Sequence, residues 1–168
     1  MKTIYYTNHV RNRAMKVIRA SEENLIELAN LQKKYMEYHQ EIDAYFAFNE
    51  SISELWIEYM KKVIRDKDQV VYCALVEDKI VGYMTAATAE RPPIHRIGKT
   101  GLIGDVFVLA DFRKQGVFSW LLEKTLDWLR RKGVAYVEHP VASGNQLGLK
   151  VWRSKGFDDY MIFMRKKI

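Results

Sequence analysis

The sequence has few of the residues that cross-link or interrupt a chain. Among its 168 residues there are one cysteine, Cys73, and three prolines. A single cysteine excludes an intrachain disulfide and suits a reducing compartment. We therefore expect a cytoplasmic protein whose fold depends on core packing rather than on covalent cross-links.

Long apolar runs are also missing. The longest span only a few residues, far below the roughly 20 that cross a bilayer, and the first residues lack a signal-type apolar stretch. We expect neither secretion nor membrane insertion. The sequence contains no repeat, low-complexity tract or linker, which predicts a single domain over residues 15–168. Residues 1–14 show no clear periodicity and form an N-terminal extension of unknown structure.

The net charge of +6 is unevenly distributed. After residue 112, 12 Lys and Arg stand against 5 Asp and Glu, whereas Tyr35–Met60 contains six acids, seven aromatics and no Lys or Arg. A basic protein raises the hypothesis of nucleic-acid binding, but no helix combines a dense basic face with interleaved aromatics. The pattern instead predicts one region that attracts anions and another that attracts cations.

Apolar spacing and turn residues predict the secondary structure. Residues 77–79 join two β-branched runs in a tight antiparallel hairpin. Helices are predicted over 21–40, 51–65, 117–131 and 145–154, and strands over 70–76, 80–87, 102–109, 135–141 and 161–164. This order implies an α/β (α+β) fold with a mixed, mostly antiparallel sheet flanked by helices, and it excludes a Rossmann repeat.

The segment from Asp105 to Gly116 places a strand, a short turn and the start of a helix in succession. The first N–H groups of a helix have no internal partners and favour negative charge, and Gly116 allows a ligand close to the backbone. Arg113 and Lys114 add positive charge. The segment therefore predicts an anion site, although the pattern also fits a purely structural turn. A Walker loop is excluded because no Gly-Lys-Ser/Thr follows.

With its downstream spacing, the segment resembles the GNAT acetyltransferase superfamily. The resemblance rests on Arg113-x-x-Gly116 after a strand, then Asn145, then Lys155-Gly156-Phe157, and it is nearest to the small amine and polyamine N-acetyltransferases. It implies a pair of splayed strands that binds acetyl-CoA, with Pro140 close to the splay. The residues implied for acetyl-CoA are Val106, Phe107, Val108, Arg113, Lys114, Gln115, Gly116, Val117, Phe118, Ser119 and Asn145.

Two residues depart from the pattern of the superfamily. Phe118 stands where Gly or Ala is usual, and a bulky side chain there is expected to narrow the approach to the phosphates. Trp152 stands where a tyrosine commonly acts as general acid. An indole N–H donates a hydrogen bond but releases no proton at physiological pH, so Trp152 is either a catalytic-site residue of another kind or a core aromatic.

The general base remains open among three residues. Asp105 lies one residue beyond the position of the frequent glutamate of the superfamily, where this chain has Gly104. Because adjacent strand residues face opposite sides, Asp105 either acts as the base or points away from the acceptor. Glu138 and His139 are the other candidates, of which strand alternation allows one to face the site.

The remaining ligand predictions concern metals and the acceptor. The four dispersed histidines and the single cysteine give no metal-ligand spacing, and His39 and His95 are expected at the surface. In the superfamily the first two helices and their loop line the acceptor side. The resemblance therefore assigns a cationic amine to Tyr38, Glu41 and Asp43, whereas a solvated acidic surface is the alternative.

Three functions follow from these predictions. The first is acetyl transfer from acetyl-CoA to a primary amine, either of a polyamine-like small molecule or of a peptide. The second is a module of this fold that binds acyl-CoA without efficient turnover. The third, nucleic-acid binding, is the weakest. The sequence leaves monomer and homodimer open.

Overall fold

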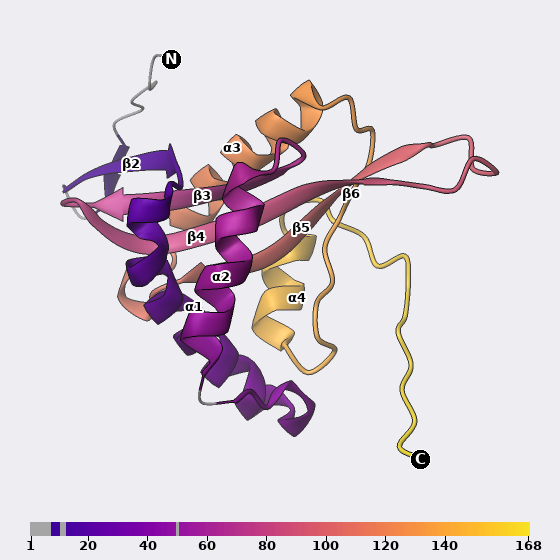
Figure 1. Cartoon of the computed structure of the whole chain (residues 1–168), viewed down its shortest axis with the longest axis horizontal. Helices are drawn as coiled ribbons and strands as arrows, with labels where there is room; N and C mark the ends of the chain where they lie inside the picture. Colours follow the sequence, from indigo (N-terminus) through magenta and orange to yellow (C-terminus); the bar gives the residue numbers. More distant parts are fainter. Residues whose placement is uncertain (1–7, 11–12, 50) are drawn as a thin grey trace.

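A mixed sheet runs through the molecule with helices on both faces (Figure 1). The computed structural model describes residues 8–10, 13–49 and 51–168. Within these residues six strands follow one another across the sheet in chain order, antiparallel except for the last, parallel pair. The strands are β1 (Asn8–Val10), β2 (Arg13–Arg19), β3 (Gln69–Val76), β4 (Lys79–Glu90), β5 (Lys99–Val108) and β6 (Val137–Glu138).

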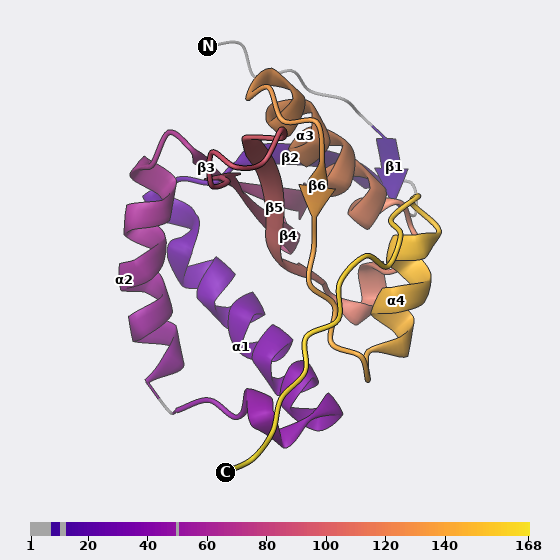
Figure 2. The ribbon, with the colours of Figure 1, turned by 90° about the vertical axis from the view of Figure 1, so that its right-hand side faces the viewer.

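The helices form two groups, one on each face of the sheet (Figure 2). Helices α1 (Leu25–Ile42) and α2 (Ile52–Arg65) cover one face, and α3 (Val117–Arg131) and α4 (Gln146–Arg153) cover the other. The strands alternate between the two cores: Val71 and Cys73 of β3 face α1 and α2, while Val70 and Ala74 face α3. The predicted α/β class and its mostly antiparallel mixed sheet are confirmed.

Local turn chemistry explains the elements that the sequence predicted well. Glu77 and Asp78 take φ values of +50° and +62°, the left-handed pair that closes a two-residue hairpin between β3 and β4. Helix α3 has the predicted bounds and ends before Gly133, whose φ of +74° stops it. At the start of α2, Ser51-Ile52-Ser53-Glu54 has the sequence of a capping box, but the Ser51 side chain makes no capping hydrogen bond.

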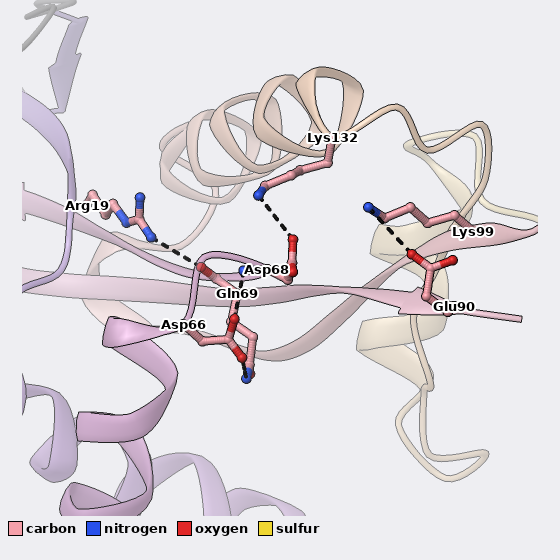
Figure 3. Close-up of polar contacts among 7 residues, drawn as sticks. All are labelled: Arg19, Asp66, Asp68, Gln69, Glu90, Lys99 and Lys132. Carbon is pink, nitrogen blue, oxygen red and sulfur yellow. Dashed lines mark hydrogen bonds and ion pairs between the residues drawn. The ribbon is translucent and has the colours of Figure 1, made fainter.

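The corner between α2 and β3 is held by polar contacts (Figure 3). Asp66 accepts hydrogen bonds from the Asp68 N–H at 2.8 Å and from Gln69 Nε2 at 2.9 Å. Lys132, just after α3, reaches Asp68 at 3.2 Å. These contacts hold the start of β3 against the segment after α3, where Gln69 pairs with Ala87 of β4.

Three segments, one near the N-terminus and two in the last third of the chain, differ from the prediction. Asn8–Val10, part of the predicted N-terminal extension, pair with β2, whereas residues 1–7 and 11–12 lie outside the described residues. Strand β6 covers only Val137–Glu138 of the predicted 135–141. Met161–Met164 form no strand and are exposed. The two residues of β6 pair only with β5, so Met161–Met164 have no partner strand there. Apolar composition predicts a strand but cannot supply its pairing partner.

Candidate active site

Strands β5 and β6 separate soon after they meet. Their pairing is limited to Gly101 with Val137 and Leu102 with Glu138. Beyond it, Nδ1 of His139 lies 3.0 Å from the Ile103 carbonyl oxygen, where a ladder bond would otherwise continue, and Pro140 has no N–H to donate. Residues 103–108 of β5 therefore present an open edge on this side, which confirms the predicted splay.

Only alternate residues of β5 offer backbone groups to the open edge. The Leu109 N–H donates to the Val81 carbonyl at 2.9 Å, and hydrogen-bonding direction alternates along an antiparallel pair. Val106 and Val108 thus turn their N–H and C=O groups outward, whereas Phe107 turns them toward β4. Phe107, expected to contribute backbone groups to this edge, instead contributes a buried ring on the α1 side.

The turn before α3 has a backbone suited to anions. Lys114 and Gly116 take φ values of +58° and +85°, and the first N–H that bonds within α3 is that of Trp120. The N–H groups of Val117, Phe118 and Ser119 thus precede the first intrahelical bond. A lysine with positive φ stores strain of about 1–3 kcal/mol, which tends to persist where function requires the conformation.

Arg113 does not extend toward this turn. Its Nε donates to the Val108 carbonyl at 2.9 Å, and its guanidinium carbon lies 5.7 Å from the Phe107 ring centre and 5.9 Å from that of Tyr38. Gln115 also faces inward, with Nε2 donating to the Asp111 carbonyl. The positive character of the turn therefore comes from its backbone and from Lys114, not from Arg113.

The two departures from the superfamily pattern pack against each other. The Phe118 ring meets Trp152 edge-on at 5.1 Å between ring centres, and Phe157 and His139 lie 4.7 and 4.1 Å from the same indole. Trp152 is only 6% exposed. The Phe118 side chain is thus directed into an aromatic cluster rather than across the turn, and the geometry favours Trp152 as a core aromatic.

The two other candidate bases, Glu138 at the end of β6 and His139 just after it, are already engaged. Burial lowers the pKa of His139 to about 4, with the Ile103 carbonyl opposing this shift and His39 adding to it. His139 is therefore neutral near pH 7 and too weak a base to hold a proton there. Glu138 hydrogen-bonds to the Tyr160 hydroxyl of the C-terminal segment.

Asn145 joins the two sides of the molecule. Its Oδ1 caps α4 by accepting the Gly148 N–H at 2.9 Å, and it also accepts the Tyr38 hydroxyl of α1 at 2.9 Å. A Cβ at Gly148 would lie 2.7 Å from Asn145 Nδ2, so a glycine is needed there. Tyr38 and Asn145, predicted to serve different ligands, are in direct contact.

A β-bulge determines where Asp105 points. Met84 pairs with Val106 and Ala86 with Ile103, so Thr85 alone opposes two residues, Gly104 and Asp105. Thr85 Oγ1 accepts the Asp105 N–H at 2.8 Å, and a Cβ at Gly104 would lie 2.7 Å from that oxygen.

The extra residue shifts the alternation of β5 by one position. Ile103 and Val106 both face the α3 core, and Asp105 faces the α1 side with Phe107. Of the two orientations that the sequence left open, the structure has Asp105 on the α1 side, since strict alternation does not hold across a bulge.

Asp105 is surrounded by neutral hydrogen-bond donors. Trp56, Gln32 and Tyr35 bond to its carboxylate, and burial nevertheless raises its pKa above the usual value. The same burial, reinforced by Asp105, raises the pKa of Tyr35 strongly. Sequence reasoning missed these three residues. Their signal was the spacing of Gln32 and Tyr35 on one face of α1, in front of a strand carboxylate.

The acidic segment, Tyr35–Met60, has two surface depressions. Glu37, Gln40, Glu41 and Phe48 line a depression of about 260 Å³. A second of about 410 Å³ adjoins it at Phe48 and extends to Trp56 and Tyr59. Among the described residues neither Glu37 nor Glu41 forms an ion pair.

Asp43, unlike Glu37 and Glu41, already forms an ion pair and is not free to bind an acceptor. Its carboxylate accepts from the Tyr45 N–H and pairs with Arg165, whose guanidinium carbon lies 4.7 Å from the Tyr45 ring centre. The Tyr45 N–H and Arg165 lower the pKa of Asp43. The C-terminal segment thus brings its own cation to one of the three predicted acceptor residues (Figure 2).

Two histidines expected at the surface differ in placement. His95 is exposed, whereas His39 is half-buried, with its ring 4.1 Å from Tyr35 and 5.6 Å from both Tyr38 and Phe46.

Within the described ranges no group of three or more His, Cys, Asp or Glu side chains is arranged to hold a metal ion. No helix in the part of the chain that the structure describes is long and apolar enough to cross a membrane.

An open strand edge, an anion-binding turn beside it and a carboxylate on the opposite face define a group-transfer site with separate donor and acceptor sides. Residues 25–157 match the acetyltransferase (GNAT) family, and the chain belongs to that family. It is therefore an acyltransferase whose acyl donor is acetyl-CoA. No curated protein matches the chain.

Solved structures share the fold at low sequence identity. A tetramutant of protein BH1408 from Bacillus halodurans superposes with a TM-score of 0.81 at 20% identity, over 90% of this chain and 99% of the other. Aminoglycoside N-acetyltransferase AAC(6')-Iy in complex with CoA gives 0.75 at 18%, over 94% and 98%. A predicted acetyltransferase from Clostridium acetobutylicum with acetyl-CoA gives 0.74 at 18%, over 91% and 96%.

Proposed function

We propose that this chain transfers the acetyl group of acetyl-CoA to a primary amine of a small cationic molecule, with Asp105 as the general base. The observation that carries the proposal is the position of Asp105. The bulge turns its carboxylate toward α1 and α2, on the face of β5 opposite α3, while the open edge of β5 lies next to it in the chain.

The donor side fits acetyl-CoA through backbone groups. The N–H groups from Lys114 to Ser119 would hold the pyrophosphate, and the outward groups of Val106 and the Val108 N–H would pair with the pantetheine arm, since the Val108 carbonyl already accepts from Arg113. Asn145 Oδ1 is occupied, which leaves its Nδ2 to donate to the same arm. An outward strand N–H would polarise the thioester carbonyl.

The reaction removes two protons from an acceptor that arrives as an ammonium ion. Asp105 would accept the first, so that the nitrogen lone pair can attack the thioester carbon. The C–S bond then breaks, the thiolate leaves, and the nitrogen gives its second proton to water to form the neutral amide. A thiol with a pKa near about 8.5 is a tolerable leaving group that water protonates, so no acid at Trp152 is required.

The acceptor side suits a cation. Tyr38 and Glu41 lie toward the end of α1, and Glu41 lines the smaller depression with Glu37 and Phe48. Carboxylates and aromatic faces both attract ammonium groups. An acceptor that also used Asp43 would have to displace Arg165.

Release of free thiol from acetyl-CoA, measured with a panel of amines, tests the proposal. A polyamine should outcompete a neutral-tailed amine of equal length, and its advantage should shrink as salt rises. Neutralising Glu41 and Asp43 together should raise the apparent KM of the amine and leave acetyl-CoA affinity unchanged, with Glu54→Gln on α2 as the control for charge removal. Equal, salt-insensitive use of neutral and cationic amines would refute a cationic acceptor.

The role of Asp105 is tested separately. Asp105→Asn should abolish turnover while acetyl-CoA still binds, and Asp111→Asn, an exposed carboxylate in the turn after β5, should be without effect. The burial of Trp152 gives no support to the alternative, a module that binds acyl-CoA without efficient turnover, because thiolate departure needs no acid there. That alternative would show tight acetyl-CoA binding and no thiol release with any amine.

A further inference from the structure

A buried hydrogen bond lies directly behind Asp105. The Tyr83 side chain on β4 is completely buried, and its hydroxyl donates to Oε1 of Gln32 on α1, which is 5% exposed. Buried polar groups such as these are rarely left without partners, because each unpaired group costs free energy. The Trp56 ring packs edge-on against Tyr83 at 6.2 Å and closes the other side.

This bond decides which end of the Gln32 amide faces Asp105. An amide has one acceptor oxygen and one donor nitrogen, and Tyr83 occupies the oxygen. The nitrogen is then the end that hydrogen-bonds to the Asp105 carboxylate. Without the Tyr83 hydroxyl, rotation of the amide by half a turn would bring its oxygen against the carboxylate, which would repel it.

We propose that Tyr83 is a positioning residue for the reaction, which acts through Gln32 by fixing the amide so that it donates to Asp105. The inference rests on the proposed role of Asp105 as the general base. It adds a buried tyrosine that touches neither substrate but controls how readily the base gains and loses its proton.

The charges around Asp105 make this control sensitive. Hydrogen bonds from the neutral donors Trp56, Gln32 and Tyr35 favour the ionised form of the carboxylate, and His39 adds an electrostatic attraction. The titratable groups that face it are Tyr35 and His39 on α1 and Tyr83 on β4, and Cys73 on β3 lies beyond Tyr83. The guanidinium of Arg113 lies over the Phe107 ring, two residues along β5.

Removing one neutral donor from a carboxylate raises its pKa. Tyr83→Phe should therefore raise the pKa of Asp105 by about half to one pH unit, measured by carboxyl ¹³C NMR titration. The acidic limb of kcat/KM should move upward by the same amount, a loss of about three- to tenfold at a pH below that limb. Affinity for acetyl-CoA should not change.

Tyr72→Phe is the matched control. Tyr72 lies on β3, packs against the opposite core and hydrogen-bonds to Arg131, so its loss should affect stability without moving the titration of Asp105. Gln32→Met removes the same donor from α1 and should give the same shift as Tyr83→Phe. This second variant keeps the test decisive if Tyr83→Phe folds poorly.

The outcomes separate this inference from the proposed function. An unchanged Asp105 titration in Tyr83→Phe, or a shift equal to that of Tyr72→Phe, would overturn the positioning role. Full activity in Asp105→Asn would instead remove Asp105 as the base, whereas the NMR shift would still report whether Tyr83 controls the carboxylate.

Discussion

His139 should make the fold sensitive to mild acid. Its pKa is about 4 in the folded protein against an ordinary value of 6.5, so protonation favours the unfolded chain. The stability that the neutral ring contributes is therefore present above pH 6.5 and is lost as the pH falls toward 4. Between pH 7.5 and 5 these two pKa values give a loss of about 2 kcal/mol.

His139→Gln isolates this contribution. A glutamine amide can still donate to the Ile103 carbonyl but does not titrate, and it loses the contact with Trp152. Urea unfolding followed by tryptophan fluorescence should show the variant less stable at pH 7.5, with the gap to the parent protein about 2 kcal/mol narrower at pH 5. His95→Gln, in an exposed loop, is the control and should show no such narrowing. A gap of equal size at both pH values would refute the reasoning.

Three further changes test other parts of the site. Gly116→Asp places a negative charge and a strained φ of +85° at the start of α3, and calorimetry should show at least a tenfold loss of acetyl-CoA affinity, whereas Gly98→Asp should bind normally. Trp152→Tyr should lower the melting temperature, because it leaves a gap in the aromatic cluster, and keep a rate equal to or above that of the parent; a rate drop of several powers of ten would give the indole a role of its own. Arg165→Ala should lower the KM of a cationic acceptor about two- to fivefold in steady-state kinetics, because it frees Asp43, and an unchanged KM would place the acceptor elsewhere.

The sequence predicted those parts of the fold that local chemistry determines. The hairpin at 77–79 needed only turn residues between two β-branched runs, and α3 needed only a glycine at each end of an amphipathic stretch. Strand β6 and Met161–Met164 depended on a partner strand, and pairing between distant segments leaves no local pattern. Apolar composition therefore predicted too long a strand at β6 and a strand at Met161–Met164 that does not form.

The same limit applies to the site. The turn before α3 was visible because its anion-binding groups belong to consecutive residues. The contacts of Asp43 with Arg165 and of Tyr38 with Asn145 join residues more than a hundred positions apart. The direction of Asp105 depended on a bulge whose acceptor, Thr85, lies on the neighbouring strand.

Because of that bulge, the number of a residue in the chain no longer gives the face of the sheet on which it lies. Counting along β5 puts Gly104 at the position of the glutamate that the resemblance implies, so a comparison by position alone finds a carboxylate missing. The extra residue advances the strand by one position, and Asp105 arrives on the face that Gly104 would have occupied in a regular ladder. Deleting Gly104 would remove the bulge and place Asp105 directly after Ile103 in a regular ladder, still on the α1 side. A carboxylate that is absent from its expected position in this sequence is thus still present at the same point of the fold.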